Sequence, residues 1–371
     1  VREERALQYD LDSELVKSWK RIIDYGPRPF GSENLRRCSE YLAEELKKTA
    51  DRAYVDTDPA EAWEITGWKL EQAEPIRREI KSYVFLNSGA SEGFRGTVKY
   101  AGKNRIWNMY VWDRYMVLDE EGRICAYVTV RGGEEAIPQM LFQGKSRIPH
   151  FLVGEEERNF LEEACRTGAV LEGYAAARWI PGAQCRNVVG HLGQGSRKVV
   201  ICGHYDTVYA TKGAYDNSAG AAVVLELGRR LKKYRLHAEI ELLLTDGEEF
   251  DLEGARNRYR KCAGQEISMV LNIDGVGRQK ILEVWSGPEP FERKIRKILD
   301  QSQEEFEAVY ICPPPPGSDH APYYDGGIPV CMLTFNDQGI LHSPEDDYRE
   351  SLIENMEVMT RLSLNLLEQL K

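Results

Sequence analysis

Six side chains of the kinds that bind metal ions occur in a fixed order along the second half of the chain. They lie in five short motifs, namely His204 in GHYDT, Asp216 in AYDNSAG, Glu248 and Glu249 in TDGEEFDLEG, Asp274 in NIDGVG and His342 in LHSPEDD. Each motif stands where a predicted strand ends or a turn begins, which is where an α/β sheet presents its ligands. Two histidines and four carboxylates are what a pair of zinc ions and one general base require. The set therefore predicts a metal-dependent hydrolase.

His204 follows the apolar run VVICG, so we expect it at the carboxyl end of a central strand. Asp206 lies two residues further on. A zinc-bound imidazole usually donates its second N–H to a carboxylate, and Asp206 is the candidate for that role. Taken alone, the pair is equally typical of a histidine that closes a strand beside a turn-forming aspartate.

Asp216 stands directly before NSAGAA, which predicts the start of a helix. A carboxylate at this position commonly caps the helix, and that structural alternative is open. The short side chains from Ser218 to Ala222 let the turn pack tightly below a site. Because a carboxylate has two oxygens, Asp216 is the candidate to bridge two metal ions.

Glu248 and Glu249 follow the apolar run AEIELLLT. Adjacent residues of an extended backbone point in different directions, so one glutamate could bind metal while the other reaches a bound water. A pair of glutamates is more often a solvated surface. This pair ends a strand too apolar for an exposed edge, where two charges require a counter-ion.

Asp274 ends SMVLNID, and His342 lies in a segment whose Pro344 and acids indicate an exposed loop. Their structural alternatives are a turn aspartate before glycine and an ordinary surface histidine. Asp319 and His320, in GSDHAPYYDGG, are candidates to support the site from behind. The other three histidines have no such context and are expected to be structural: His150, His191 and His237.

The elements that must position these side chains form an alternating pattern from Cys185 onward. Short apolar runs predict strands at 197–203, 238–245 and 268–274, and helical periodicity predicts helices at 217–234 and 351–370. This alternation indicates an α/β fold with a mainly parallel, mixed sheet sandwiched between helices.

Before residue 186 the chain has two further segments with different sequence patterns. Residues 12–50 predict two helices around GPRPFGS, with Ser32 as N-cap of the second. Aromatic runs and a hairpin turn at LDEEGRI then predict strands, and GEEERNFLEEACRTG predicts one helix that stops at Gly168. We expect a catalytic domain in two parts, residues 1–58 and 186–371, with an inserted, mostly β domain at 59–185.

Composition excludes several classes of partner. The chain has 371 residues, 42% hydrophobic and 29% charged, and a net charge of −11. This charge argues against binding to nucleic acid or to an anionic membrane surface. No apolar run approaches the roughly 20 residues of a membrane helix.

The eight cysteines are scattered without a CxxC pair, and Cys202 and Cys331 lie in apolar runs. This pattern argues against structural zinc or a disulfide framework. We expect a cytoplasmic protein. The chain begins with Val1, so removal of a signal peptide is an open alternative.

Taken together, HxDT, DNSAG, the glutamate pair followed by LEGA, NxDxxG, SDH and HSPEDD resemble the motifs of a known family. These are the zinc-dependent exopeptidases typified by aminopeptidase Y, to which bacterial leucyl aminopeptidase and glutamate carboxypeptidase belong. The resemblance covers about residues 185–350 and, less closely, 12–50. It implies the zinc exopeptidase fold. The insert resembles a protease-associated domain through IPHFLVGEEERNFLEEACRTG and CRNVVG.

The resemblance also implies roles for the candidate residues. Two zinc ions per chain would be held by five ligands, with Asp216 bridging: His204, Asp216, Glu249, Asp274 and His342. Glu248 would act as the general base toward a metal-bridged water. The implied activity is that of an aminopeptidase acting on peptide substrates.

Two departures from the family pattern bear on the stabilisation of an oxyanion. Tyr215 replaces the acid that usually precedes the bridging aspartate, and Leu341 stands where some members have a tyrosine. Tyr323 or Tyr324 is the candidate substitute. The alternatives to an aminopeptidase are a carboxypeptidase that uses Arg278 or Lys280, a one-zinc cyclase and a non-catalytic peptide-binding relative. The oligomeric state stays open.

Overall fold

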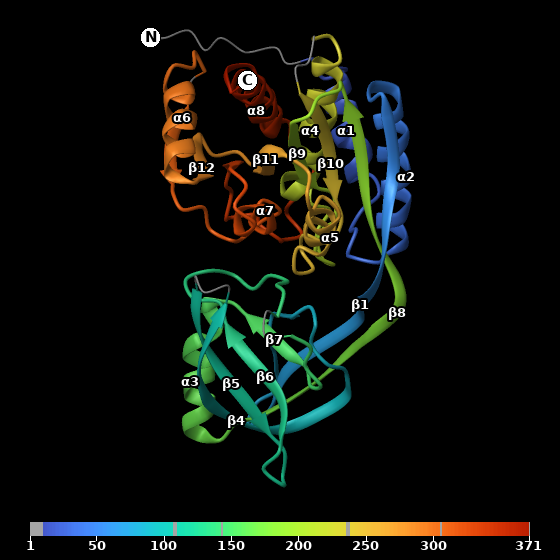
Figure 1. Ribbon diagram of the computed structural model, residues 1–371. Helices are drawn as coiled ribbons and strands as arrows, with labels where there is room; N and C mark the ends of the chain where they lie inside the picture. The colour runs from blue at the N-terminus through green and yellow to red at the C-terminus, as the bar shows by residue number, and fades with distance from the viewer. Residues whose placement is uncertain (1–9, 107–109, 142–143, 235–237, 305, 371) are drawn as a thin grey trace.

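The computed structural model describes residues 10–106, 110–141, 144–234, 238–304 and 306–370, so His237 lies outside the described residues. Two units lie one above the other in Figure 1 and are joined by two long strands. These are β1 (Arg52–Glu74) and β8 (Val170–Leu192), which pair with each other in antiparallel fashion along their length. One unit is α/β and contains the first and last helices of the described residues, α1 (Glu14–Ile23) and α8 (Ile353–Gln369), and the other is mostly β.

The sheet of the α/β unit has four parallel strands at its centre. Their order is β14 (Val330–Phe335), β11 (Ile267–Val276), β9 (Lys198–His204) and β10 (Glu239–Thr245). On one side, β12 (Ile281–Gly287) runs antiparallel to β14 and carries the parallel strand β13 (Glu307–Ile311). On the other side, β8 runs antiparallel to β10. The expected α/β class with a mainly parallel, mixed sheet is confirmed.

Helices cover both faces of this sheet because its strands are apolar on both sides. Within β9, Ile201 packs into a large hydrophobic core, whereas Val200 and Cys202 pack into a second, smaller one. The larger core includes side chains of α1 (Glu14–Ile23), α2 (Glu33–Thr49), α4 (Ala219–Leu231), α6 (Glu289–Asp300) and α8 (Ile353–Gln369). The smaller one is covered by α5 (Glu253–Lys261) and α7 (Ala321–Asp325).

The expected helix signals act where the sequence places them. Ser32 Oγ accepts a hydrogen bond from the backbone N–H of Leu35 at the start of α2, which satisfies a donor that the helix leaves free. Gly168 has φ +72° and ends α3 (Arg158–Thr167), a conformation that suits glycine. Both predictions are confirmed.

The mostly β unit is built on the far halves of β1 and β8. Its further strands are β2 (Arg78–Glu79), β3 (Ser82–Val84), β4 (Ser91–Ile106), β5 (Tyr110–Leu118), β6 (Ile124–Val130) and β7 (His150–Val153), with a short turn η1 (Glu155–Glu157) before α3. The proposed boundaries at 58/59 and 185/186 fall inside β1 and β8, where the backbone runs on without a break. The division into domains and the protease-associated identity stay predictions.

Cys202 and Cys331 are fully buried in β9 and β14, as their apolar surroundings indicate. All eight cysteines are free thiols. Among the described residues, no helix is both long and apolar enough to span a membrane.

Candidate metal centre

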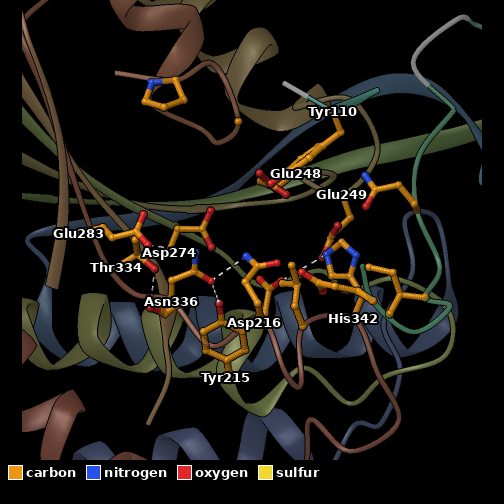
Figure 2. Close-up of a pocket in the computed structure, with 18 of the residues that line it drawn as sticks. Tyr110, Tyr215, Asp216, Glu248, Glu249, Asp274, Glu283, Thr334, Asn336 and His342 are labelled. Carbon is orange, nitrogen blue, oxygen red and sulfur yellow. Dashed lines mark hydrogen bonds and ion pairs between the residues drawn. The ribbon is translucent and has the colours of Figure 1, made fainter. Parts of the chain in front are cut away.

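The candidate ligands converge beside the carboxyl ends of the central strands, and Figure 2 labels all of them except His204. They form two groups that share one residue, His204 with Asp216 and Asp274, and Asp216 with Glu249 and His342. Within each group the candidate ligand atoms all lie within 4.8 Å of one another. The chain thus brings together five residues that are up to 138 positions apart in the sequence, from His204 to His342.

Asp216 faces both groups with different oxygens. Its Oδ1 lies 3.0 Å from His204 Nε2, and its Oδ2 lies 3.3 Å from His342 Nε2. Asp274 Oδ1 lies 3.1 Å from His204 Nε2, and Glu249 Oε1 lies 3.0 Å from His342 Nε2. This is the arrangement that a carboxylate bridging two metal ions needs.

Asp216 is held by its own short turn, η2 (Ala214–Ser218), rather than by a regular helix. The backbone N–H groups of Tyr215 and Asp216 donate to the two carboxylate oxygens of Asp346, at 2.6 and 3.0 Å. Asn217 donates to the Ile273 carbonyl at 2.9 Å, which ties the turn to β11. Asp346 was not among the residues singled out in the sequence, although it lies in the HSPEDD motif.

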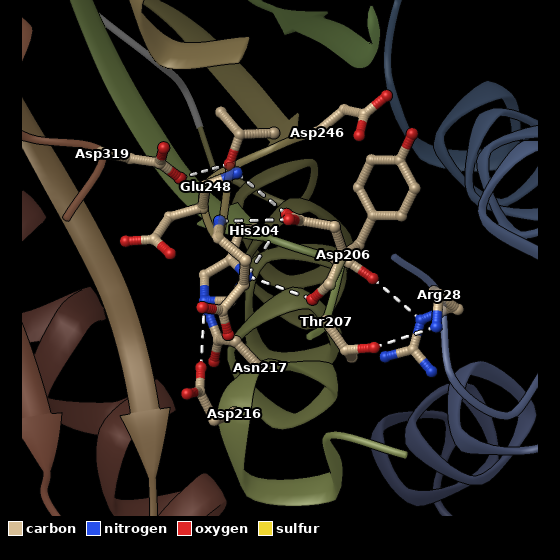
Figure 3. Close-up of polar contacts among 12 residues, drawn as sticks. Arg28, His204, Asp206, Thr207, Asp216, Asn217, Asp246, Glu248 and Asp319 are labelled. Atoms are coloured by element: carbon tan, nitrogen blue, oxygen red, sulfur yellow. Dashed lines mark hydrogen bonds and ion pairs between the residues drawn. The ribbon is translucent and has the colours of Figure 1, made fainter. Parts of the chain in front are cut away.

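Asp206 contacts three parts of the site at once (Figure 3). Its carboxylate accepts hydrogen bonds from the backbone N–H groups of Glu248 and Glu249, each at 3.1 Å. Asp206 Oδ1 also lies 3.4 Å from His204 Nδ1. One fully buried carboxylate therefore orients the histidine and the turn that carries both glutamates.

Arg28 is a second residue whose role the sequence did not reveal. It is fully buried, and it comes from the GPRPFGS segment between α1 and α2. Its guanidinium donates to the Tyr205 carbonyl at 2.8 Å and to Ser218 Oγ at 2.7 Å. Arg28 thus joins the segment after His204 to the turn that carries Asp216. The Gly/Pro pattern around it predicted only a turn.

The charges of the site are unbalanced. Among the described residues, no lysine or arginine lies within ion-pair distance of the five candidate ligands or of Glu248. Burial raises the pKa of Glu248 well above its usual value, and the carboxylates of Asp274 and Glu249 add to this effect. Burial alone would lower the pKa of His342, but Glu249 and Asp216 outweigh it and raise the pKa to about 10.

The residues fit zinc. Imidazole nitrogens and carboxylate oxygens are its usual ligands in proteins. Glu249 Oε1 is buried and accepts no hydrogen bond from the described residues. An anionic cluster of this kind, withdrawn from water, requires cations to offset its charge.

His342 differs from its prediction in one respect. Its segment is a loop, but the side chain is only 6% exposed because the mostly β unit covers it. The Nδ1 atom of His342 lies 3.0 Å from the Pro138 carbonyl oxygen of that unit. Since a carbonyl only accepts hydrogen bonds, Nδ1 carries the proton and Nε2 faces Asp216 and Glu249.

The four residues predicted to support the site have different positions. Asp319 is fully buried and accepts a hydrogen bond from Thr245 Oγ1, at the end of β10; burial raises its pKa to about 7. His320 Nε2 donates to the Pro315 carbonyl at 2.8 Å, and burial lowers the pKa of His320 to about 4. Both lie behind the ligands.

The expected substitution of Tyr323 or Tyr324 for an oxyanion donor is not what the structure shows. Tyr323 is buried in the smaller hydrophobic core, with its ring 5.4 Å from that of Tyr259. Neither Tyr323 nor Tyr324 lines the pocket over the ligands. The short α7 turns both side chains away from the ligands, and nothing in the sequence around them reveals its direction.

Both units line that pocket. From the mostly β unit come Tyr110, Trp112, Arg131, Glu134 and Ile137. From the α/β unit come the ligands and, among others, Glu283, Trp285, Ile311, Met332, Thr334 and Leu341. The sequence did not indicate this wall, because it forms only when the mostly β unit folds back over the sheet.

A third group of metal-type residues lies elsewhere. We call it the paired cluster, and it consists of His191, Glu239 and Glu241 with Lys198 and Arg258. The five candidate ligands, of which Asp216 is one, form the pocket cluster together with Glu248.

Comparison with known proteins finds a family model that matches the part of the chain with these residues. Residues 187–367 match the model of peptidase family M28. This part of the chain is similar to the peptidases of family M28, and we call residues 187–367 the M28 segment. All five candidate ligands lie within the M28 segment, and the resemblance to zinc exopeptidases found in the motifs is confirmed.

A curated relative matches part of the chain in sequence. Aminopeptidase YwaD of Bacillus subtilis (strain 168) is 24% identical over 163 residues, which make up 40% of this chain and 35% of that relative. The chain therefore spans about a third of the length of this curated relative.

Two solved structures cover nearly the whole chain. A zinc aminopeptidase from Bacillus subtilis has a TM-score of 0.70 at 18% identity, covering 97% of this chain and 95% of that one. The aminopeptidase from Aneurinibacillus sp. strain AM-1 has a TM-score of 0.69 at 16% identity, covering 95% and 93%. At these identities the likeness establishes a shared fold.

Proposed function

We propose that this protein is a zinc-dependent metallopeptidase that releases residues from the N-terminus of peptides, with two zinc ions in the pocket cluster. The observation that carries the proposal is the pair of three-residue groups joined by Asp216, beside Glu248, within an M28 segment. The names of its relatives, which include zinc aminopeptidases, support the same activity.

The donor set assigns each ion its ligands. His204, Asp216 and Asp274 would hold one ion, and Asp216, Glu249 and His342 the other. When bound, the ions supply Lewis acidity that polarises a peptide carbonyl and lowers the pKa of a water. Glu283 and the other lining residues outside the pocket cluster would bind no metal and would contact the substrate.

Glu248 is the candidate general base. Its carboxyl group lines the pocket beside the ligands, and its backbone is fixed by the Asp206 carboxylate. In this role it accepts a proton from the attacking water and delivers it to the leaving amine. Asp206 acts through His204 and the glutamate turn, so it is a positioning residue.

The mostly β unit supports an exopeptidase. It roofs the pocket with Tyr110, Trp112 and Arg131, which restricts entry to the end of a peptide chain. The carboxypeptidase alternative needs a free cation for the terminal carboxylate. Arg278 is bound to Asp337, and Lys280 lies 2.6 Å from Glu354. Arg131 lines the pocket, but it lies 2.6 Å from Glu134.

The test is the Glu248→Gln variant, assayed with aminoacyl-coumarin substrates after zinc loading. We expect the zinc content to stay at two ions per chain while kcat falls about 10²–10⁴-fold, the range for loss of a general base. Glu345→Gln, in the exposed HSPEDD loop, is the matched control and should keep wild-type turnover.

Blocked peptides separate the alternatives. An aminopeptidase cleaves a C-blocked peptide and spares an N-acetylated one, and the reverse pattern would refute the proposal. A cyclase would act on N-terminal glutamine without peptide cleavage. A non-catalytic relative would bind peptide without turnover after zinc loading.

A further inference from the structure

One wall of the pocket is a face of the sheet beside the ligands, formed by β13, β12 and β14. Trp285 on β12 lies opposite Met332 on β14 and Ile311 on β13, and Glu283 lies opposite Thr334. Residues two apart on a strand share a face, and all five line the pocket. This wall therefore combines three apolar side chains and the Thr334 hydroxyl with one carboxylate, that of Glu283.

Glu283 has no cationic partner among the described residues. Its Oε2 accepts from the indole N–H of Trp285 at 3.0 Å, and its Oε1 accepts from the Asn336 amide at 3.3 Å. Both donors are neutral, so they orient the carboxylate without offsetting its charge. A carboxylate has about four lone-pair sites, which leaves room for further donors from a ligand.

The position of Glu283 sets the length of the ligand group that it would contact. β12 is separated from β11, which carries Asp274, by β14 alone. Neighbouring strands lie about 4.8 Å apart, so the backbones that carry Glu283 and Asp274 are roughly 10 Å from each other. Figure 2 shows Asp274, Thr334 and Glu283 side by side. A group that starts at the ligands must be long to reach Glu283.

We propose that the pocket selects peptides whose N-terminal residue is lysine or arginine, with Glu283 as the specificity-determining residue. This inference rests on the proposed function. Long basic side chains place their methylene stems on apolar surface and their charge at its end. Trp285 and Met332 supply that surface, and Glu283 receives the ammonium or guanidinium group.

The other cation of the substrate, its α-amino group, belongs elsewhere. The scissile carbonyl is adjacent to this group, so both lie beside the pocket cluster, two strands from Glu283. Outside the pocket cluster, Glu134 is the other acidic residue that lines the pocket; it comes from the mostly β unit and already forms an ion pair with Arg131. Glu283 is thus the carboxylate that suits a side chain.

The experiment compares kcat/KM for arginyl-, citrullinyl-, lysyl- and leucyl-coumarin substrates. Citrulline has the shape of arginine without its charge. For the zinc-loaded wild type we expect arginine to exceed citrulline about 10–100-fold, the range of one charge-assisted hydrogen-bonded contact. In Glu283→Gln the arginine and lysine values should fall by this factor, while those for leucine and citrulline stay within about twofold.

Glu134→Gln is the matched control, because it removes the pocket carboxylate that comes from the mostly β unit and is paired with Arg131, and it should keep the arginine preference. Leucine turnover by Glu283→Gln reports that the variant is folded. Hydrolysis of leucine without preference for arginine over citrulline overturns this inference alone. An equal loss for all four substrates in Glu283→Gln also overturns it, because Glu283 would then act on the shared α-amino group or on the fold. No hydrolysis of any substrate by the wild type overturns the proposed function and this inference with it.

Discussion

The pocket cluster and the paired cluster contain the same types of residue, histidine and carboxylates, but differ in whether arginine and lysine offset their charge. Each contains at least one buried histidine and at least two carboxylates, placed on or next to strands of one sheet. In the paired cluster, Arg258 donates twice to Glu241, at 2.7 and 2.6 Å, and Lys198 lies 2.7 Å from it. The pocket cluster has no such cation among the described residues.

The difference appears in the pKa values. Burial alone would raise the pKa of Glu241, but Arg258 and Lys198 outweigh it and lower the pKa below its usual value. Burial raises the pKa of Glu248, and only His204 opposes this shift, without outweighing it. Arg258 and Lys198 offset the charge of the paired cluster, whereas in the pocket cluster only His204 and His342 oppose the carboxylates, as we expect of the proposed zinc site. Charge balance, more than residue type, therefore distinguishes a metal site from a structural ion pair.

Removal of metal should have the largest effect. Dialysis against a chelator is expected to abolish activity and to lower the melting temperature, and added zinc should restore both. At a free zinc concentration 1000-fold above Kd, each ion stabilises the fold by about 4 kcal/mol. Differential scanning fluorimetry and metal analysis measure this. An unchanged melting temperature after full depletion would contradict the account of the pocket cluster.

Substitution within the paired cluster should affect stability alone. Glu241 is 0% exposed, so Glu241→Gln leaves Lys198 and Arg258 buried without their anion. Loss of one partner of a buried pair costs about 3–5 kcal/mol. Denaturant unfolding measures this loss. Zinc content and kcat of the folded protein should match the wild type, and loss of zinc would show that the paired cluster binds metal.

A smaller effect is expected from Asp206→Asn. The amide keeps one acceptor for the backbone of Glu248 or Glu249 but removes the charge beside His204. Residues that orient zinc ligands typically contribute 10–100-fold to affinity or activity. Zinc titration with a competing chelator measures the change. Asp251→Asn, in the same loop and partly exposed, should leave the affinity unchanged.

The smallest effect is expected from His191→Gln. The imidazole contacts Glu239 at 2.7 Å and stacks on Tyr54, so its loss should cost about 1 kcal/mol, the value of one hydrogen bond. Thermal unfolding measures this loss, and two zinc ions should remain bound. A drop to one ion would reverse the comparison of the two clusters.

Much of the α/β unit can be predicted from local patterns. The runs that form β9, β10 and β11 are continuous and apolar because these strands are buried on both faces. The ligands follow from the same logic, since His204 and the Glu248 turn come directly after such runs. Patterns of this kind involve residues close together in the chain, so they can be recognised in a single sequence.

Contacts between distant segments cannot be predicted in this way. Asp346 lies in the HSPEDD motif, but its role depends on two backbone N–H groups 131 and 130 positions earlier. The burial of His342 depends on Pro138 of the other unit. The pocket wall depends on the pairing of Glu283 on β12 with Thr334 on the neighbouring strand β14. Each of these contacts arises only after the chain has folded.

The contact between Pro138 and His342 has a consequence for how substrate entry and chemistry are related. The carbonyl that sets the tautomer of His342 belongs to the unit that roofs the pocket, and that unit is joined to the sheet by β1 and β8. Any swing of the roof about this two-stranded arm would carry the carbonyl away and free the imidazole to rotate. In such an open form Nε2 of His342 would no longer be held toward Asp216 and Glu249. Contact between the mostly β unit and the sheet would thus be coupled to the orientation of a candidate ligand.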